Sequence, residues 1–331
     1  MSMSMSKKIE DKLNVICVIS NPCNYKRRIE LAKTFINHML ETKNVNLFVV
    51  ECIYPKLNQQ YKITDKDNPN HLQLTADTIL WTKENMINVA VKKLLPSDYK
   101  AFAFLDADLH FNNQNWAEET LIKLNSCDIL QPFHFGYNLN NKNELDQNPK
   151  IMYSWCYYRL MYGLNKPRKP NNPTKKSASS EELTQEAIHP GWAWAMTRTA
   201  YEKMGGLYDL AIVGGGDTIL AKSIMNNNYM NTDKPYVLCS PYFRKSLYDY
   251  QQRCLGLKFG YTSGVVHHNY HGSLQNRHYT DRWQILIFNN YNPYYFLTRN
   301  ECGMYKASPL FPPILEAEIM NYFRERNEDN S

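Results

Sequence analysis

The sequence has 331 residues, of which 43% are hydrophobic and 21% are charged, as in a globular chain long enough to bury a substantial core. The formal net charge of +6 is modest, and the basic residues are spread along the chain, which argues against a nucleic-acid-binding protein. No stretch approaches the roughly 20 apolar residues of a membrane span, and the N-terminus lacks the apolar core of a signal peptide.

The eight cysteines are scattered without a CxxC pair, so we expect free thiols in a reducing compartment. The expected free thiols, together with the lack of a membrane span or signal peptide, predict a cytoplasmic protein, located in the host cytoplasm if the source is a virus. The 24 tyrosines also favour aromatic surfaces that could hold sugar rings or bases.

After a polar tail over residues 1–12, the chain opens with the pattern of a βαβ unit. An apolar strand is expected at Val15–Ser20, and apolar residues at helical spacing follow over residues 29–40. The loop between them places the cations of Lys26–Arg28 at the start of the helix. Cations there oppose the helix dipole unless an anion lies nearby, so we expect this loop to face an anionic ligand.

Three elements lead to the centre of the predicted fold. A second strand is expected at Asn46–Ile53, a polar loop over residues 55–70, and an amphipathic helix at Trp81–Leu95. The segment Lys100–Phe111, KAFAFLDADLHF, then has the apolar run of a strand that is buried on both faces.

Asp106 and Asp108 end that central strand, separated only by Ala107. In an open α/β sheet, the loops beyond the carboxyl ends of the strands line the ligand crevice. Residues two apart in an extended segment share a face, so the two carboxylates are expected to clamp a divalent cation such as Mg²⁺ or Mn²⁺. The alternative is that Asp106 caps a turn and Asp108 is solvated.

The rest of the chain continues the α/β pattern. Ile151–Leu160 is strand-like and aromatic, and Lys166–Glu186, rich in proline, lysine and serine, is expected to be a mobile loop. The other expected elements are helices at 116–124, 218–225, 240–254 and 312–326, and strands at 128–132, 189–196 and 261–266.

Two further groups could carry chemistry. His267, His268 and His271 follow an apolar strand, and neutral imidazole is a good ligand for Mn²⁺ beside carboxylates; His268 is the first choice as ligand and His271 the second. Asp217 follows the glycine turn Gly214–Gly216. It could be the N-cap of the next helix, a general base that takes a proton from an acceptor hydroxyl, or both.

Trp192 and Trp194 stand two residues apart in the strand expected at 189–196. Alternation would send both rings to one side of that strand, either as a sugar-stacking face or as core. In the following glycine turn, Gly215 and Gly216 would let the backbone pass close to a ligand.

The order of these segments resembles the metal-dependent GT-A glycosyltransferases, most closely the galactosyltransferase-like branch that includes the β-1,4-galactosyltransferases. LDAD looks like the metal motif of that branch, VGGGD like the turn that supplies the base, and GVVHH like the strand that delivers a metal histidine. GWAWAMTRTAYEKMGGLYD, KENMINVA and NPCNYKRR are similar to other segments of the family. The resemblance covers residues 14–285.

The chain departs from the family pattern at several positions. Ala90 replaces a glycine, Gly216–Asp217 stands where the family has several acids in a row, and Ile212–Val213 replaces a tryptophan. The segment HGSLQNRHYTDR has no counterpart in the family. Its Arg277 could reach a phosphate or pair with Asp281.

The resemblance implies an α/β fold of GT-A type in a single large domain, and an inverting glycosyltransferase that uses Mn²⁺ or Mg²⁺. Its donor would be a nucleotide-diphosphate sugar, expected to be a UDP-sugar, and its acceptor a glycan or another hydroxyl-bearing molecule. The alternatives are a retaining transferase on the same fold, a sugar nucleotidyltransferase, and a non-catalytic carbohydrate- or nucleotide-binding protein.

Pattern and resemblance together assign roles along the chain. Residues 13–135 are expected to bind the nucleotide sugar, 136–290 to hold the acceptor and the catalytic base, and 291–331 to close the fold, with a segment around 271–282 closing over the donor. The assigned residues are Asp217 as base; Asp106, Asp108, His268 and His271 for the metal; Pro22, Tyr25, Arg27, Arg28, Glu51, Lys83, Asn88, Asp106 and Arg277 for the donor; and Trp192, Trp194, Gly215 and Gly216 for the acceptor.

Overall fold

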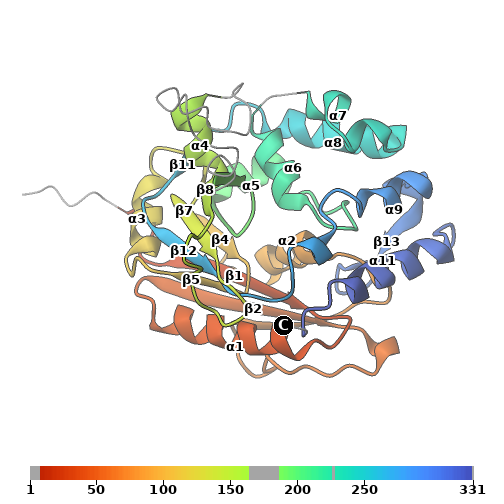
Figure 1. Ribbon diagram of the computed structural model, residues 1–331, viewed down its shortest axis with the longest axis horizontal. Coiled ribbons are helices and arrows are strands. Elements are labelled where there is room, and N and C mark those ends of the chain that lie inside the picture. The colour runs from red at the N-terminus through yellow and green to blue at the C-terminus, as the bar shows by residue number, and fades with distance from the viewer. Residues whose placement is uncertain (1–7, 164–185, 226–227, 330–331) are drawn as a thin grey trace, which may run out of the picture.

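The computed structural model describes residues 8–163, 186–225 and 228–329. Its centre is a seven-stranded sheet with the strand order β11-β6-β10-β4-β1-β2-β3 (Figure 1). Neighbouring strands pair in parallel, except that β10 runs antiparallel to both β4 and β6. The predicted α/β fold with a mixed, mainly parallel sheet is therefore confirmed. The strands are β1 (Leu13–Ser20), β2 (Val45–Ile53), β3 (His71–Thr75), β4 (Ala101–Leu105), β6 (Ile129–Gln131), β10 (Ala193–Thr197) and β11 (Phe259–Tyr261).

Strand β4 is buried on both faces, as predicted. Phe102 and Phe104 contact one core, while Ala101, Ala103 and Leu105 contact the other. Helices α1 and α3 pack on the second core, and α2 and α5 on the first, so the sheet is a middle layer between helices (Figure 1). The helices are α1 (Lys26–Glu41), α2 (Lys83–Lys93), α3 (Trp116–Lys123), α4 (Trp155–Tyr162), α5 (Arg198–Met204), α6 (Gly216–Ser223), α7 (Tyr229–Thr232), α8 (Pro241–Cys254), α9 (Trp283–Phe288), α10 (Pro293–Phe296) and α11 (Pro313–Glu325).

A second sheet, with the order β5-β12-β7-β8-β9, begins where the chain leaves β4. Its edge strand β5 directly follows the Asp106–Asp108 segment and pairs antiparallel with β12. This pairing brings two distant parts of the sequence together at the end of the central strand. The strands are β5 (Leu109–Phe111), β7 (Phe135–Asn138), β8 (Ile151–Ser154), β9 (Glu186–His189) and β12 (Val265–His268), and a separate hairpin consists of β13 (Leu297–Arg299) and β14 (Tyr305–Ala307).

The prediction of one strand over Ile151–Leu160 was wrong. Strand β8 ends at Ser154, whose side chain accepts a hydrogen bond from the backbone N–H of Tyr157 and caps helix α4. A serine at this position satisfies a helix N–H that would otherwise lack a partner. The aromatic residues after it favoured a strand, but the cap decided the local structure. Strand β3 was not predicted.

The strand predicted at 261–266 is divided between the two sheets. Strand β11 ends at Tyr261 in the large sheet, and β12 begins at Val265 in the small one. Between them Gly264 has a φ of +131°, a conformation that residues with a side chain rarely adopt. The glycine therefore allows the chain to change sheets just before the histidines.

All eight cysteines are free thiols, as expected. Within the described ranges, no helix is both long enough and apolar enough to cross a membrane. The mobile loop expected over 166–186 lies outside the described residues except for its last position, and so do the first seven residues of the expected tail.

Histidine 38 makes folding stability depend on pH. On α1, His38 Nε2 accepts a hydrogen bond from the backbone N–H of Phe111 (3.1 Å), and its ring stacks on His110. Burial, followed by the nearby His110, lowers the pKa of His38 from 6.5 to about 4. The unfolded chain therefore binds a proton that the folded chain excludes, so stability is lost as the pH falls from 6.5 towards 4.

We expect His38→Gln to remove this part of the acid sensitivity, because a glutamine oxygen can accept the same hydrogen bond without titrating. Between pH 7.5 and pH 5, the free energy of unfolding should fall by about 1 kcal/mol less in the variant than in the wild type, allowing for the partial exposure of the ring. Urea denaturation at both pH values measures this difference. Equal losses in the two proteins would contradict it.

Candidate active site

A cavity of about 780 Å³ opens where strands β1 and β4 end. Its wall includes the last residues of β1, the Leu105–Asp108 segment after β4, the first turn of α2, the start of α6, and the loop that follows β12. In open α/β sheets, ligands bind beyond the carboxyl ends of the strands. The cavity is therefore where the sequence predicts the site.

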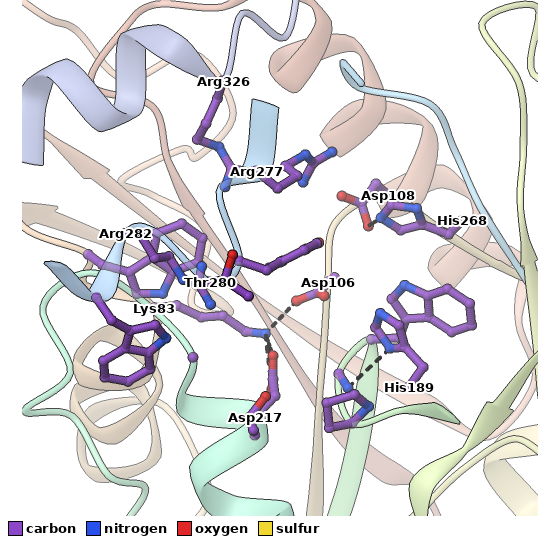
Figure 2. Close-up of a pocket in the computed structure, with 18 of the residues that line it drawn as sticks. Lys83, Asp106, Asp108, His189, Asp217, His268, Arg277, Thr280, Arg282 and Arg326 are labelled. Carbon is purple, nitrogen blue, oxygen red and sulfur yellow. Dashed lines mark hydrogen bonds and ion pairs between the residues drawn. The ribbon is translucent and has the colours of Figure 1, made fainter. Parts of the chain in front are cut away.

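One side of this cavity holds a compact group of three residues, Asp108, His268 and His271, which we call the metal group. His268 stands opposite Leu109 in the β5–β12 pairing, and the backbone N–H of Asn269 donates to the carbonyl oxygen of Asp108 (2.8 Å). His271 Nε2 lies 2.9 Å from Asp108 Oδ2. His268 Nε2 lies 3.5 Å from Asp108 Oδ1, and Figure 2 shows these two residues side by side. The strand pairing thus places the two predicted metal histidines around the second aspartate.

These three residues fit a divalent metal ion. One ligand atom from each lies within 4.8 Å of the others, and Asp108 Oδ1 is buried without a hydrogen-bond partner in the described part of the chain. Burial lowers the pKa of His268 to about 3, so its imidazole is neutral near pH 7, the form that binds metal ions. Two imidazoles and one carboxylate suit Mn²⁺ better than Mg²⁺, which prefers oxygen ligands.

Asp106 is not part of this group, contrary to the expected clamp. Strand β4 ends at Leu105 and the chain turns at residues 107–108, so the two carboxylates do not share the face of an extended strand. Asp106 Oδ1 instead lies 2.6 Å from Lys83 Nζ. Lys83 Nζ is also 3.1 Å from Asp217 Oδ2 and therefore bridges two carboxylates (Figure 2).

Asp217 lies in the first turn of α6 and not at the N-cap, where Gly215 stands with a φ of +93°. Both Asp217 and Gly215 line the cavity, whereas Gly216 does not. A Cβ on Gly216 would lie 2.2 Å from Glu84 Oε1. The lack of a side chain at Gly216 therefore allows the start of α6 to lie close to helix α2.

The cavity holds ionisable groups whose pKa values are shifted. Burial, together with Asp217 and Asp108, raises the pKa of Asp106 to about 6, although Lys83 opposes the shift. Burial alone would lower the pKa of Lys83, but Asp106 and Asp217 raise it above its usual value. Lys83 consequently remains an ammonium ion between the two carboxylates.

His189 is a cavity residue that sequence analysis did not assign. Its Nδ1 accepts a hydrogen bond from the backbone N–H of Gly191 (3.1 Å). Burial lowers the pKa of His189 to about 4, so it is a neutral base near pH 7. Sequence analysis placed His189 at the start of one strand over 189–196, but β9 ends at His189 and β10 begins only at Ala193.

Trp192 and Trp194 do not share a face, contrary to the alternation argument. Strand β10 begins after Trp192, which has a φ of +75°. The Trp192 ring is 2% exposed and stacks on His189 and His268, with centroids 4.1 Å and 5.6 Å away. Trp194 is in the opposite core, where its Nε1 donates to the carbonyl oxygen of Pro190. Trp192 lines the cavity and packs against its histidines, whereas Trp194 does not line it.

The side-chain carboxylates of Glu328 and Asp329 lie at the basic start of α1, where an anionic ligand was expected. Asp329 accepts hydrogen bonds from the backbone N–H groups of Lys26 (3.1 Å) and Arg27 (2.8 Å). Arg28 Nε donates to Glu328 Oε2 (2.9 Å). The unfavourable cations at this helix terminus are therefore compensated within the fold.

Of the residues assigned to the donor, Arg28, Lys83, Asp106 and Arg277 line the cavity. Pro22, Tyr25, Arg27, Glu51 and Asn88 do not line it, and several of them hold other segments in place. Tyr25 Oη donates to the carbonyl oxygen of Phe323, and Arg27 Nε donates to that of Tyr270.

Glu51 and Asn88 are buried and engaged elsewhere. The Glu51 carboxylate accepts hydrogen bonds from the backbone N–H groups of residues 62–64. Asn88 donates to the carbonyl oxygen of Leu207 and accepts from the backbone N–H of that residue. Both side chains fix loops in the fold.

Glu328 connects the end of the chain to the metal group. Its carboxylate is fully buried, accepts a hydrogen bond from Arg326 Nε (2.8 Å), and lies 3.6 Å from His271 Nδ1. His271 therefore has a carboxylate at each ring nitrogen, Asp108 on one side and Glu328 on the other. A carboxylate at the outer nitrogen of a metal-binding histidine fixes its orientation. Sequence analysis missed Glu328 because no local pattern marks a contact between residues that lie far apart in the sequence.

We expect Glu328→Gln to weaken Mn²⁺ binding by about 10- to 100-fold, because His271 would lose the carboxylate that orients it. Isothermal titration with Mn²⁺ measures the loss. Glu325→Gln is a matched control: Glu325 is exposed, and its carboxylate lies 3.7 Å from His278 Nε2. An unchanged Mn²⁺ dissociation constant in folded Glu328→Gln would show that Glu328 does not support the metal group.

Comparisons with known proteins give similarities of fold and no sequence relative. No protein-family model matches the chain, and no curated protein matches its sequence. The catalytic domain of Drosophila β-1,4-galactosyltransferase 7 in complex with xylobiose is 14% identical, with 77% of this chain and 68% of that chain covered and a TM-score of 0.36.

Two further solved structures are similar at the same level. A variant of the Drosophila enzyme in complex with manganese, UDP-Gal and xylobiose is 11% identical, with 75% of this chain and 64% of that chain covered and a TM-score of 0.35. A Desulfovibrio desulfuricans protein described as a nucleotide-diphospho-sugar transferase is 9% identical, with 95% and 98% covered and a TM-score of 0.33. Because the identities and TM-scores are this low, the activity and substrates of this chain are matters for proposal.

Proposed function

We propose that this chain is a metal-dependent glycosyltransferase that moves a sugar from a nucleotide-diphosphate donor, a UDP-sugar, to an acceptor hydroxyl with inversion at the anomeric carbon. The observation that carries the proposal is that Asp108, His268 and His271 line the same cavity as Asp217. A metal group and a carboxylate on opposite sides of one cavity provide both functions that the reaction needs.

The donor side of the cavity can hold a diphosphate. A divalent metal on Asp108, His268 and His271 would neutralise the diphosphate and stabilise it as the leaving group. Arg277 supplies a further positive charge there, because its Nη2 donates to the carbonyl oxygen of His271 (3.0 Å) and its side chain lines the cavity. Asp281, the other partner considered for Arg277, instead lies near His278 Nδ1 (3.8 Å).

On the acceptor side, Asp217 would remove the proton from the acceptor hydroxyl. The acceptor oxygen then forms a bond to the anomeric carbon, while the bond from that carbon to the diphosphate oxygen breaks and its electron pair leaves with the diphosphate. Lys83 holds the Asp217 carboxylate in the cavity and keeps Asp106 beside it.

Two alternatives share the same cavity. A retaining transferase would use the same metal group, and NMR determination of the anomeric configuration of the product separates the two mechanisms. A non-catalytic nucleotide- or carbohydrate-binding protein would bind the donor without releasing the nucleotide.

The proposal predicts a rise in melting temperature that requires both Mn²⁺ and a UDP-sugar, because a ligand that binds only the folded state stabilises it. At a ligand concentration of about 100 times the dissociation constant, the stabilisation is about 2.7 kcal/mol. A thermal-shift panel of nucleotide sugars, each with and without Mn²⁺, tests this and identifies the donor. If no nucleotide shifts the melting temperature with any metal, the proposal fails.

A further inference from the structure

The wall of the cavity carries more cationic than anionic side chains. Seven lysines and arginines line it, against four aspartates. Four of these cations have carboxylate partners: Lys83 pairs with Asp106 and Asp217, and Lys222 with Asp233, while Arg28 and Arg326 both pair with Glu328. The seven cations are Arg28, Lys83, Lys222, Lys234, Arg277, Arg282 and Arg326.

Arg282 is a buried cation without a carboxylate partner in the described part of the chain. It is 8% exposed, and its Nε has no hydrogen-bond partner there. Its Nη1 donates to the hydroxyl of Tyr322 (3.2 Å), which also accepts from Arg326 Nη1. Burial by itself raises the pKa of Tyr322, but the two guanidinium groups hold it below its usual value. Arg326 is paired with Glu328, so Arg282 is the guanidinium at this phenol that has no carboxylate partner among the described residues.

A buried charge without a partner is costly, so the arrangement calls for an anion. The indole Nε1 of Trp81 is also buried without a partner in the described residues, and the Arg282 guanidinium lies 6.0 Å from the Trp81 ring centroid. Two neighbouring side chains of the cavity wall, from different segments, therefore each have a nitrogen without a partner among the described residues.

Arg282 lies on the Asp217 side of the cavity. A Cβ on Gly214 would be 3.0 Å from Arg282 Nη1, and a Cβ on Gly215 would be 3.4 Å from Arg282 Nη2. Asp217 follows two residues after Gly215, in the first turn of α6. In Figure 2, Arg282 lies near Lys83, and Arg277 lies towards Asp108. Arg277 and Arg282, for which the described residues provide no carboxylate partner, thus belong to different ends of the cavity.

We propose that Arg282, together with Trp81, forms a second anion subsite, which binds a phosphate group of the acceptor. The inference rests on the proposed function and defines its acceptor class: a hydroxyl compound that carries a phosphate. A guanidinium group recognises phosphate oxygens through parallel hydrogen bonds. Arg282 and Trp81 come from different segments, and an anion with three or four oxygens can accept from both side chains at once, which a planar carboxylate does less readily.

Binding of phenyl phosphate to protein that is already saturated with Mn²⁺ and UDP tests the subsite, with phenol as the uncharged control. Isothermal titration should show binding of phenyl phosphate and none of phenol. In Arg282→Gln, binding of phenyl phosphate should weaken by at least about tenfold, as expected for loss of a charged hydrogen-bond donor, while the affinity for UDP with Mn²⁺ stays within about twofold of the wild type. Lys26→Gln, an exposed charge outside the cavity wall, controls for the general loss of positive charge.

Three results would overturn the subsite. Phenyl phosphate could fail to bind, its binding could be unaffected by Arg282→Gln, or Arg282→Gln could weaken UDP binding by the same factor, which would place Arg282 at the donor. Failure of the proposed function can be distinguished from failure of the subsite. If the proposed function is wrong, UDP does not bind with Mn²⁺ in the wild type. Binding of phenyl phosphate to the nucleotide-free protein would still depend on Arg282. Arg282→Lys, which keeps the charge, should retain part of the binding if the folded site is intact.

Discussion

Asp108→Ala is expected to abolish Mn²⁺-dependent donor turnover and to weaken Mn²⁺ binding by at least about 100-fold, because it removes the only carboxylate among the three ligands found in the described residues. The loss should appear both in titrations with Mn²⁺ alone and in the release of UDP from the UDP-sugar that the thermal-shift panel identifies. Full turnover in Asp108→Ala after removal of metal with a chelator would contradict the proposed mechanism.

Asp106→Asn is the matched control, because it changes the neighbouring carboxylate of the same motif. Asp106 pairs with Lys83 and does not belong to the metal group. Its replacement should therefore change the Mn²⁺ dissociation constant by less than about threefold, well below the change expected from losing a metal ligand. Equal losses in Asp106→Asn and Asp108→Ala would instead support the clamp of two aspartates that the sequence alone suggested.

Asp217→Asn is expected to lower turnover by about 100- to 10,000-fold while UDP binding with Mn²⁺ is unchanged, because loss of a general base affects the chemical step. The asparagine keeps the size of the side chain, and Lys83 keeps its ion pair with Asp106. The rate of UDP release and the dissociation constant of UDP with Mn²⁺, measured on the same preparation, separate catalysis from binding.

His189 provides the comparison for that result. It is a neutral base on the same cavity wall, so His189→Gln should lower turnover less than Asp217→Asn if Asp217 is the base. Near-normal turnover in Asp217→Asn, together with a large loss in His189→Gln, would transfer the role of base to His189. A protein with no turnover at all in the wild type would support the binding-protein alternative.

The sequence predicted the parts of the site that follow from local patterns. The apolar alternation of β4 and the acids at its end indicated the carboxyl edge of the sheet, and the strand before His268 placed that histidine beside Asp108. The glycine turn before Asp217 also pointed to the cavity. In each case the polar residue stands at or next to the boundary of a regular element, which the sequence pattern can locate.

The parts that depend on a turn or on long-range packing were missed. A turn after Leu105 separates Asp106 from Asp108, and a positive φ at Trp192 breaks the alternation with Trp194. Arg282 and Glu328 acquire their roles through contacts with segments that no periodic pattern connects to them. Such contacts depend on how the helices pack, which the sequence does not reveal residue by residue.

The attachment of residues 326–329 to the start of α1 also bears on the order in which the protein folds. The hydrogen bonds of Asp329 and Glu328 to residues 26–28 join positions 300 to 303 apart in the chain. Contacts of such long range form late, because a long loop has to close before they can be made. The first βαβ unit can fold before residues 326–329 are synthesised, but His271 acquires its outer carboxylate only after they have docked. The proposed metal group is therefore complete only after this docking.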